Sequence, residues 1–113
     1  MATSMMNSFM NLLWTNESGT SATSFDNQDI TVAGIDAYSL IGIIFYNGSH
    51  TYIQFCIIAN NNETQSCSAV MYNGTHSRTV RLRGGDVLGF GIGYANGTVN
   101  QGAMIPHQVY GIK

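Results

Sequence analysis

Bulky and small residues alternate along 88–94, LGFGIGY, with the period of two that is typical of a β-strand. The small positions are Gly89, Gly91 and Gly93, so one face of this strand is bulky and the other is bare backbone. A glycine inside a strand costs about 0.5–1 kcal/mol. Three of them therefore indicate that another group, such as the backbone of a second segment, approaches the bare face closely.

The same period continues through most of the chain after residue 28, interrupted by turn signals about twelve residues apart. This spacing is typical of an antiparallel sandwich or barrel. We predict an all-β fold, an antiparallel β-sandwich of jelly-roll-like form with about seven or eight strands. The expected strands are 29–34, 38–46, 50–59, 65–72, 77–83, 87–95, 98–104 and 107–112, and the turns between them include Asn47-Gly48, Asn61-Asn62, Asn73-Gly74, Gly84-Gly85 and Asn96-Gly97.

The loop at residues 84–86 decides which residues face each other across the strands 77–83 and 87–95. A two-residue loop would place Arg81 opposite Leu88. A three-residue loop instead pairs apolar residues with one another and puts Arg81 and Arg83 on the glycine face, so we prefer it. It sets these pairs opposite each other: Leu82 and Leu88, Val80 and Phe90, and Arg78 and Ile92.

Residues 1–28 differ from the rest and are predicted to be an N-terminal arm and connector, with the sandwich domain over 29–113. Apolar residues in 1–14 recur at helical spacing, which predicts a short apolar arm or helix. It lacks the basic start of a signal peptide and is too short and polar to cross a membrane. Residues 15–28 are rich in Ser and Thr and span roughly 45 Å when extended, enough to reach a neighbouring subunit. The apolar positions are Met5, Met6, Phe9, Met10, Leu13 and Trp14.

The charge and the length of the chain limit the kinds of partner that it is expected to bind. The 113 residues suffice for one domain, and only 9% are charged, with four basic residues and a net charge of −2. Ordinary soluble domains have about 25% charged residues. We expect no nucleic-acid partner, because phosphate binding depends on several Lys and Arg contacts. A nearly neutral surface also gives little protection against association.

Cys56 and Cys67 are the two cysteines. If a hairpin turns at Asn61-Asn62, they lie directly opposite each other with Cβ atoms about 4.5–5.5 Å apart. We therefore predict a disulfide, and the alternative is two buried thiols side by side. A bridge would indicate an oxidising compartment, a virion surface or a hyperthermophile.

Five Asn-x-Ser/Thr sequons indicate glycosylation if the chain is secreted. Several of these asparagines are followed by glycine, so the alternative is that they form hairpin turns. The asparagines are Asn16, Asn47, Asn62, Asn73 and Asn96.

Catalytic and cofactor motifs are not found in the sequence. The glycine run departs from the dinucleotide fingerprint because Tyr94 stands where the last glycine is needed. His50, His76 and His107 lack the spacing of metal ligands. We expect no enzyme, no cofactor and no metal.

Arginines and tyrosines are the candidate ligand contacts. Arg81 and Arg83 could hold a carboxylate, an acidic sugar or acidic residues of another subunit through forked hydrogen bonds. The alternative is a solvated strand with Arg83 paired to Asp86. Tyr46 and Tyr72 each precede an Asn-Gly turn and could stack against a sugar.

In outline the chain resembles the compact all-β subunits of virion fibres and extracellular filaments, a likeness of class carried by no diagnostic motif. The first hypothesis is a structural protein at the virion surface or outside the cell. It assembles with copies of itself by inserting its N-terminal arm into a neighbour, beside the glycine face, and such a contact can propagate into a filament. The alternative is a glycan-binding or receptor-binding module at the tip of a viral fibre.

Overall fold

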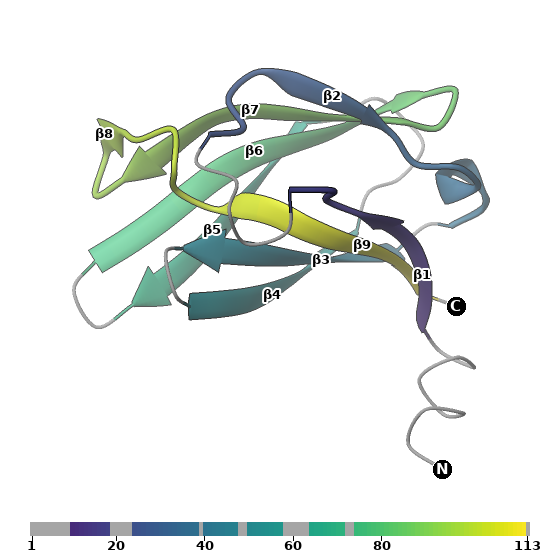
Figure 1. The fold of residues 1–113 in the computed structure, drawn as a ribbon, viewed down its shortest axis with the longest axis horizontal. Coiled ribbons are helices and arrows are strands. Elements are labelled where there is room, and N and C mark those ends of the chain that lie inside the picture. Colours follow the sequence, from purple (N-terminus) through teal and green to yellow (C-terminus); the bar gives the residue numbers. More distant parts are fainter. Residues whose placement is uncertain are drawn as a thin grey trace, which may run out of the picture.

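The computed structural model describes residues 10–18, 24–38, 40–47, 50–57, 64–71 and 74–112; at 47, 50–57, 64–67 and 69–71 it describes the backbone alone. These residues form nine β-strands and one short 3-10 helix, η2 (Ile35–Ala37). Two antiparallel sheets pack face to face (Figure 1). The β-sandwich predicted from the alternating pattern is confirmed.

The strand order explains how the chain closes on itself. In the first sheet the order is β1 (Met10–Thr15), β9 (Ile105–Ile112), β3 (Leu40–Asn47) and β4 (His50–Ile57). In the second sheet it is β2 (Gln28–Thr31), β7 (Val87–Ala95), β6 (Gly74–Gly84) and β5 (Thr64–Met71), and β8 (Thr98–Val99) pairs with β7. The last long strand thus returns to lie beside the first, as in Greek-key arrangements.

The core lies between the two sheets and follows the alternation in the sequence. Buried aliphatic and aromatic side chains of β3, β6, β7 and β9 meet there, among them Ile41, Ile43, Phe45, Val80, Leu82, Leu88, Phe90 and Val109. Phe25 also belongs to this core, with its ring 5.4 Å from that of Phe90 in an edge-to-face contact. The sandwich therefore includes residues that precede the predicted domain boundary at residue 29.

Residues 10–15 form strand β1 and not part of a helix, which corrects the prediction for the second half of the arm. The strand pairs with β9 from Met10 opposite Ile112 to Thr15 opposite Gln108, with an irregularity between Leu12 and Trp14. The irregularity lets the consecutive residues Leu13 and Trp14 both pack against the core. A short helix is marginal by itself, and pairing with β9 gives the same residues backbone partners and burial.

The other half of the arm, with Met5, Met6 and Phe9, lies outside the described residues. Among the interface residues predicted from the arm, the structure therefore places only Met10, Leu13 and Trp14. All three are in β1, paired with β9 of the same chain.

The hairpin expected between Cys56 and Cys67 is wrong. Cys56 pairs with Ile41 of β3, whereas Cys67 pairs with Arg78 of β6, so the two strands that carry the cysteines lie in different sheets. The apolar strand β4 continues the hairpin with β3, and the chain then crosses to the second sheet. The cysteine side chains lie outside those described, and the disulfide stays a prediction.

The register of β6 and β7 is as predicted at two pairs. The predicted three-residue loop is instead the two-residue turn 85–86, because Gly84 pairs with Val87 after a register shift next to Leu82. Leu82 lies opposite Leu88 and Val80 opposite Phe90. Beyond that point a bulge shifts the pairing, and Arg78 lies opposite Gly93 instead of Ile92. The bulge turns Gly93 toward the inner face, so the three glycines do not share one face as the alternation implied.

The predicted strand 98–104 is also shorter than expected. Only Thr98–Val99 pairs with β7, and residues 101–104 form a turn. In the described part of the chain, no helix has the length and apolar character needed to cross a membrane.

Candidate binding groove on the outer face of the second sheet

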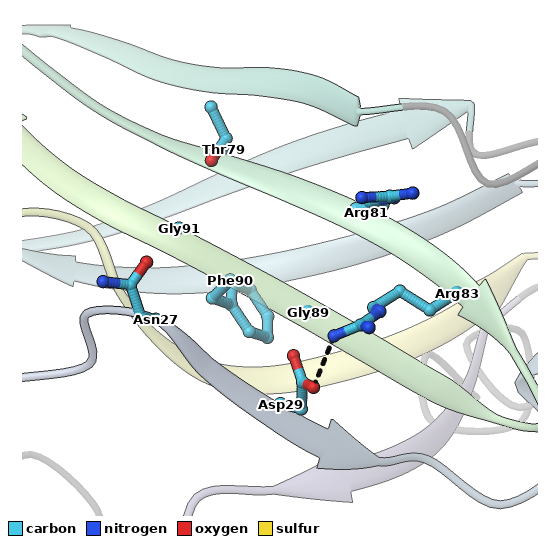
Figure 2. Close-up of a pocket in the computed structure, with 8 residues that line it drawn as sticks. All are labelled: Asn27, Asp29, Thr79, Arg81, Arg83, Gly89, Phe90 and Gly91. Atoms are coloured by element: carbon cyan, nitrogen blue, oxygen red, sulfur yellow. Dashed lines mark hydrogen bonds and ion pairs between the residues drawn. The ribbon is translucent and has the colours of Figure 1, made fainter.

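A groove of about 320 Å³ lies on the outer face of the second sheet, with Gly89 and Gly91 of β7 as its floor (Figure 2). Side chains of β6 form one wall, and residues in and just before β2 form the other. The volume is at the lower end of the range for small-molecule sites. The lining residues are Asn27, Asp29, Thr79, Arg81, Arg83, Gly89, Phe90 and Gly91.

The glycine floor lets side chains from both neighbouring strands meet above β7. A Cβ atom at Gly89 would lie 2.8 Å from Oδ1 of Asp29 and 3.2 Å from Cδ of Arg83. A Cβ atom at Gly91 would overlap Oγ1 of Thr79. The close approach predicted from the glycines is therefore real. At Gly89 and Gly91 the nearest groups are side chains of the same chain, whereas at Gly93 the nearest is the backbone carbonyl of Asn100.

Arg83 and Asp29 form an ion pair across the floor. Nη1 of Arg83 lies 2.7 Å from Oδ2 of Asp29 (Figure 2). The alternative partner considered from the sequence, Asp86, instead exchanges hydrogen bonds with Asp36: each backbone N–H donates to the other carboxylate, at 3.2 and 3.3 Å. Arg83 therefore points into the groove and not toward the loop that ends its strand.

Arg81 shares the groove with Arg83, as predicted. It is exposed, lies opposite Gly89 and lines the wall formed by β6. Both arginines alternate with the buried Val80 and Leu82, so the register that sets Leu82 opposite Leu88 places cations outside and apolar residues inside.

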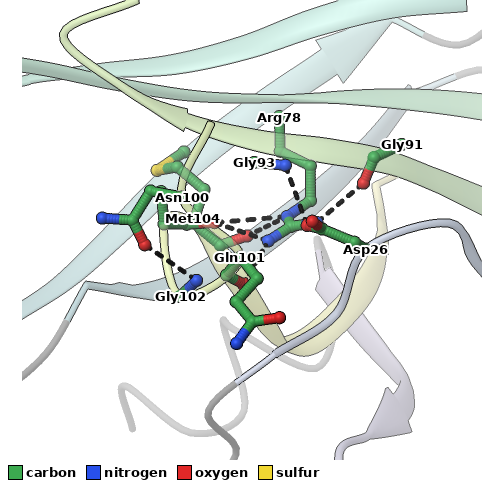
Figure 3. Close-up of polar contacts among 9 residues, drawn as sticks. Asp26, Arg78, Gly91, Gly93, Asn100, Gln101, Gly102 and Met104 are labelled. Atoms are coloured by element: carbon green, nitrogen blue, oxygen red, sulfur yellow. Dashed lines mark hydrogen bonds and ion pairs between the residues drawn. The ribbon is translucent and has the colours of Figure 1, made fainter. Parts of the chain in front are cut away.

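Behind the groove floor lies a buried arginine that sequence reasoning did not select as important. The Arg78 side chain is 0% exposed and forms an ion pair with Asp26, 2.8 Å from Nη1 to Oδ1 (Figure 3). It also donates to four carbonyl oxygens, at 2.7 Å to Gly91, 2.9 Å to Gln101, 2.8 Å to Ala103 and 2.9 Å to Met104. The sequence did carry a signal, because the preferred register put this arginine on the apolar face.

The charges of this buried pair stabilise each other. Desolvation lowers the pKa of the Arg78 guanidinium, and its contact with Asp26 opposes that change. Partial burial raises the pKa of Asp26, but a hydrogen bond from the Gly93 N–H, at 3.0 Å, and the guanidinium together hold it below its ordinary value. Both side chains therefore remain ionised at neutral pH.

The buried pair also positions the groove. Nη1 of Arg78 holds the carbonyl of Gly91, which is part of the floor. Asp26 immediately precedes Asn27, a wall residue whose N–H donates to the same carbonyl at 3.3 Å. Asn27 has a φ of 54°, a left-handed conformation that asparagine tolerates better than most residues. Floor and wall are thus fixed from below by one guanidinium.

The tyrosines proposed to stack on a sugar do not line the groove where the structure describes them. Tyr46 belongs to β3 in the first sheet, and its ring packs edge-to-face on that of His107, with centroids 4.5 Å apart. Tyr72 lies outside the described residues. The groove therefore combines charged, amide and hydroxyl groups without Tyr46.

Asn16 is buried in the folded domain, and glycosylation there stays a prediction. It is 7% exposed, its Nδ2 donates to the Pro106 carbonyl at 3.0 Å, and its Oδ1 accepts from the Ser18 N–H at 2.9 Å. A glycan on Nδ2 would break this buried contact.

Asn96 is exposed at a turn, and its Oδ1 accepts from the Thr75 N–H at 2.9 Å. Glycosylation at Asn96 stays a prediction. Asn62 and Asn73 lie outside the described residues, as does the side chain of Asn47.

Comparison with protein-family models, with curated proteins and with solved structures gave no significant match to this chain. Within the described ranges, no three His, Cys, Asp or Glu side chains come close enough to share a metal ion. Function is therefore argued from the groove itself, since a sandwich fold is compatible with many functions.

Proposed function

We propose that this domain is a non-enzymatic binding module that takes a saccharide in the groove above Gly89 and Gly91. The observation that supports the proposal is the Asp29–Arg83 pair, set across a glycine floor with Asn27 and Thr79 beside it. Sugar hydroxyls both donate and accept hydrogen bonds. This groove offers them a carboxylate acceptor, guanidinium donors, and an amide and a hydroxyl that can do either.

The composition adds support for this site over other surfaces. Only 9% of the chain is charged, yet Asp29, Arg81 and Arg83 gather around one opening of about 320 Å³. A saccharide-binding role fits a module at a virion surface or outside the cell, such as the tip of a viral fibre. The predicted disulfide and the sequons belong to the same proposal.

Amide chemical shifts of the ¹⁵N-labelled domain, titrated with a panel of monosaccharides, test the proposal. We expect the shifts to centre on Gly89, Gly91 and Asn27, because these backbone groups form the floor and the rim. Arg81→Ala should weaken binding, whereas Thr98→Ala, an exposed change in β8, should not. Shifts that avoid the floor of the groove would refute this site.

Self-assembly is the second candidate function, favoured by the first sheet. β1 is an edge strand, and its residue Leu12 is 52% exposed. An edge strand presents unpaired backbone groups to which a strand of another chain can add. The proposed partner is a second copy of this chain, with Met5, Met6 and Phe9 packing against the neighbour and open-ended addition producing a filament.

Strand β1, which carries Met10, Leu13 and Trp14, pairs with β9 of the same chain. We therefore limit the proposed assembly contact to residues 1–9 and the outer edge of β1. A chain that lacks residues 1–9 keeps β1 intact, and Leu12→Ser removes the exposed apolar side chain alone. We expect both changes to shift the protein toward monomer in size-exclusion chromatography and negative-stain microscopy. An intact chain that is already monomeric under the same conditions rules this candidate out.

A further inference from the structure

We infer that the ligand of this groove is a carboxylate-bearing saccharide, and that in the free protein Asp29 occupies the place on Arg83 that the ligand carboxylate takes. This inference rests on the proposed saccharide-binding function and specifies its ligand class. It is carried by the geometry around Gly89.

The space above Gly89 is shaped for a carboxylate. A Cβ atom at this residue would lie 2.8 Å from Oδ1 of Asp29, so the position is filled by a carboxylate oxygen and is open only because the residue is glycine. The other oxygen of Asp29 accepts from Nη1 of Arg83 at 2.7 Å. A guanidinium is a planar fork that can hold a carboxylate with two parallel hydrogen bonds.

The Asp29–Arg83 contact is suited to exchange. The two side chains are 49% and 50% exposed. Breaking an ion pair of such exposure therefore weakens ligand binding by at most about fivefold in Kd. Asp29 sits on β2, a four-residue strand at the edge of its sheet, so only its side chain has to turn away. By contrast, the Arg78–Asp26 pair is fixed by buried carbonyl groups and cannot exchange in this way.

The rest of the groove favours a sugar over a simple carboxylate. Thr79 lies over Gly91, one residue pair further along the floor from Gly89, and Asn27 lines the same end. A sugar whose carboxylate binds Arg83 would therefore have its hydroxyl groups beside the hydroxyl of Thr79 and the amide of Asn27. Arg81 adds positive charge to the same wall.

Methyl glucuronide and methyl glucoside provide a matched pair of probes, because they differ only in a carboxylate against a hydroxymethyl group. We would measure their Kd values for the wild-type domain and for Asp29→Asn by ¹⁵N chemical-shift titration at low salt. We expect the wild type to prefer the glucuronide. Asp29→Asn should bind the glucuronide about two- to fivefold more tightly and should gain no affinity for the glucoside.

Two controls complete the experiment. Arg83→Gln should remove the preference for the glucuronide, and acetate should bind more weakly than the glucuronide. Equal wild-type affinities for the two glycosides, or weaker glucuronide binding by Asp29→Asn, would overturn the inference while leaving a saccharide site in place. Acetate binding as strong as glucuronide binding would overturn the part played by the sugar. Absence of binding of both glycosides would remove the proposed function as well.

Discussion

Replacing Arg78 with methionine tests whether the buried guanidinium holds the groove and the core together. The change keeps much of the aliphatic stem but leaves the carboxylate of Asp26 without its cation and removes the guanidinium donor from four carbonyl oxygens. Removing one partner of a buried ion pair costs about 3–5 kcal/mol. Domains of this size unfold with about 5–15 kcal/mol, so the variant should lose a large share of its stability.

Urea denaturation followed by circular dichroism measures this loss directly, and Arg81→Met on the outer face of the same strand is the matched control. We expect Arg81→Met to change the unfolding free energy by less than about 1 kcal/mol, since its side chain is exposed. For Arg78→Met we expect the unfolding free energy to fall by about 3–5 kcal/mol, and Tm in a thermal melt followed by the same signal to fall by roughly 10–25 °C. A loss of equal size in the two variants would contradict this role of Arg78, because it would show that the buried arginine stabilises the domain no more than the exposed one does.

Three further predictions concern neighbouring features. Asp26 has a lowered pKa in the folded state, so its stabilising contribution is present at neutral pH and is lost on acidification below about pH 4. Below that pH the urea midpoint of the wild type should fall more steeply than that of Asp26→Asn. Urea midpoints that fall in parallel with pH in the two proteins would contradict this. Gly91→Ala should lower the unfolding free energy because its Cβ overlaps Thr79. Adding Thr79→Ala to this variant should restore part of the lost free energy in a double-mutant cycle. Additive losses of free energy in the double variant would count against the contact. Intact mass under reducing and non-reducing conditions should differ by two hydrogens if Cys56 and Cys67 are bridged, and identical masses would show free thiols.

The sequence predicted the sandwich because its information is local. Alternation of apolar and polar residues, interrupted by Asn-Gly and Gly-Gly turns, determines where strands begin and end and which face is buried. The register at Val80 and Phe90 followed for the same reason, since one slip would exchange the faces of both strands. The arginine wall of the groove is therefore predictable from the alternation alone.

The parts that were missed depend on contacts between segments far apart in sequence. The bulge that turns Gly93 inward is coupled to Arg78, which needs carbonyl groups from residues 101–104 and a carboxylate from residue 26. No local pattern shows that these groups meet. The spacing of apolar residues around Met10 likewise matched a helix, because an edge strand with an irregularity can bury consecutive residues.

The pairing of Asp29 with Arg83 could not be predicted either. These two residues are 54 positions apart, and the nearer Asp86 offered an equally plausible carboxylate. What the sequence did contain was the glycine at position 89, which is required before any side chain can cross β7. The groove is thus predicted in its floor and in one wall, and the structure adds the other wall.

A crystal structure of the domain with methyl glucuronide bound would show whether the groove holds the carboxylate of a sugar on Arg83. We predict density for the sugar above Gly89 and Gly91, with its carboxylate about 3 Å from the guanidinium of Arg83 and with Asp29 turned away. A sugar seated elsewhere on the molecule, or one bound in the groove while Asp29 still holds Arg83, would contradict this prediction.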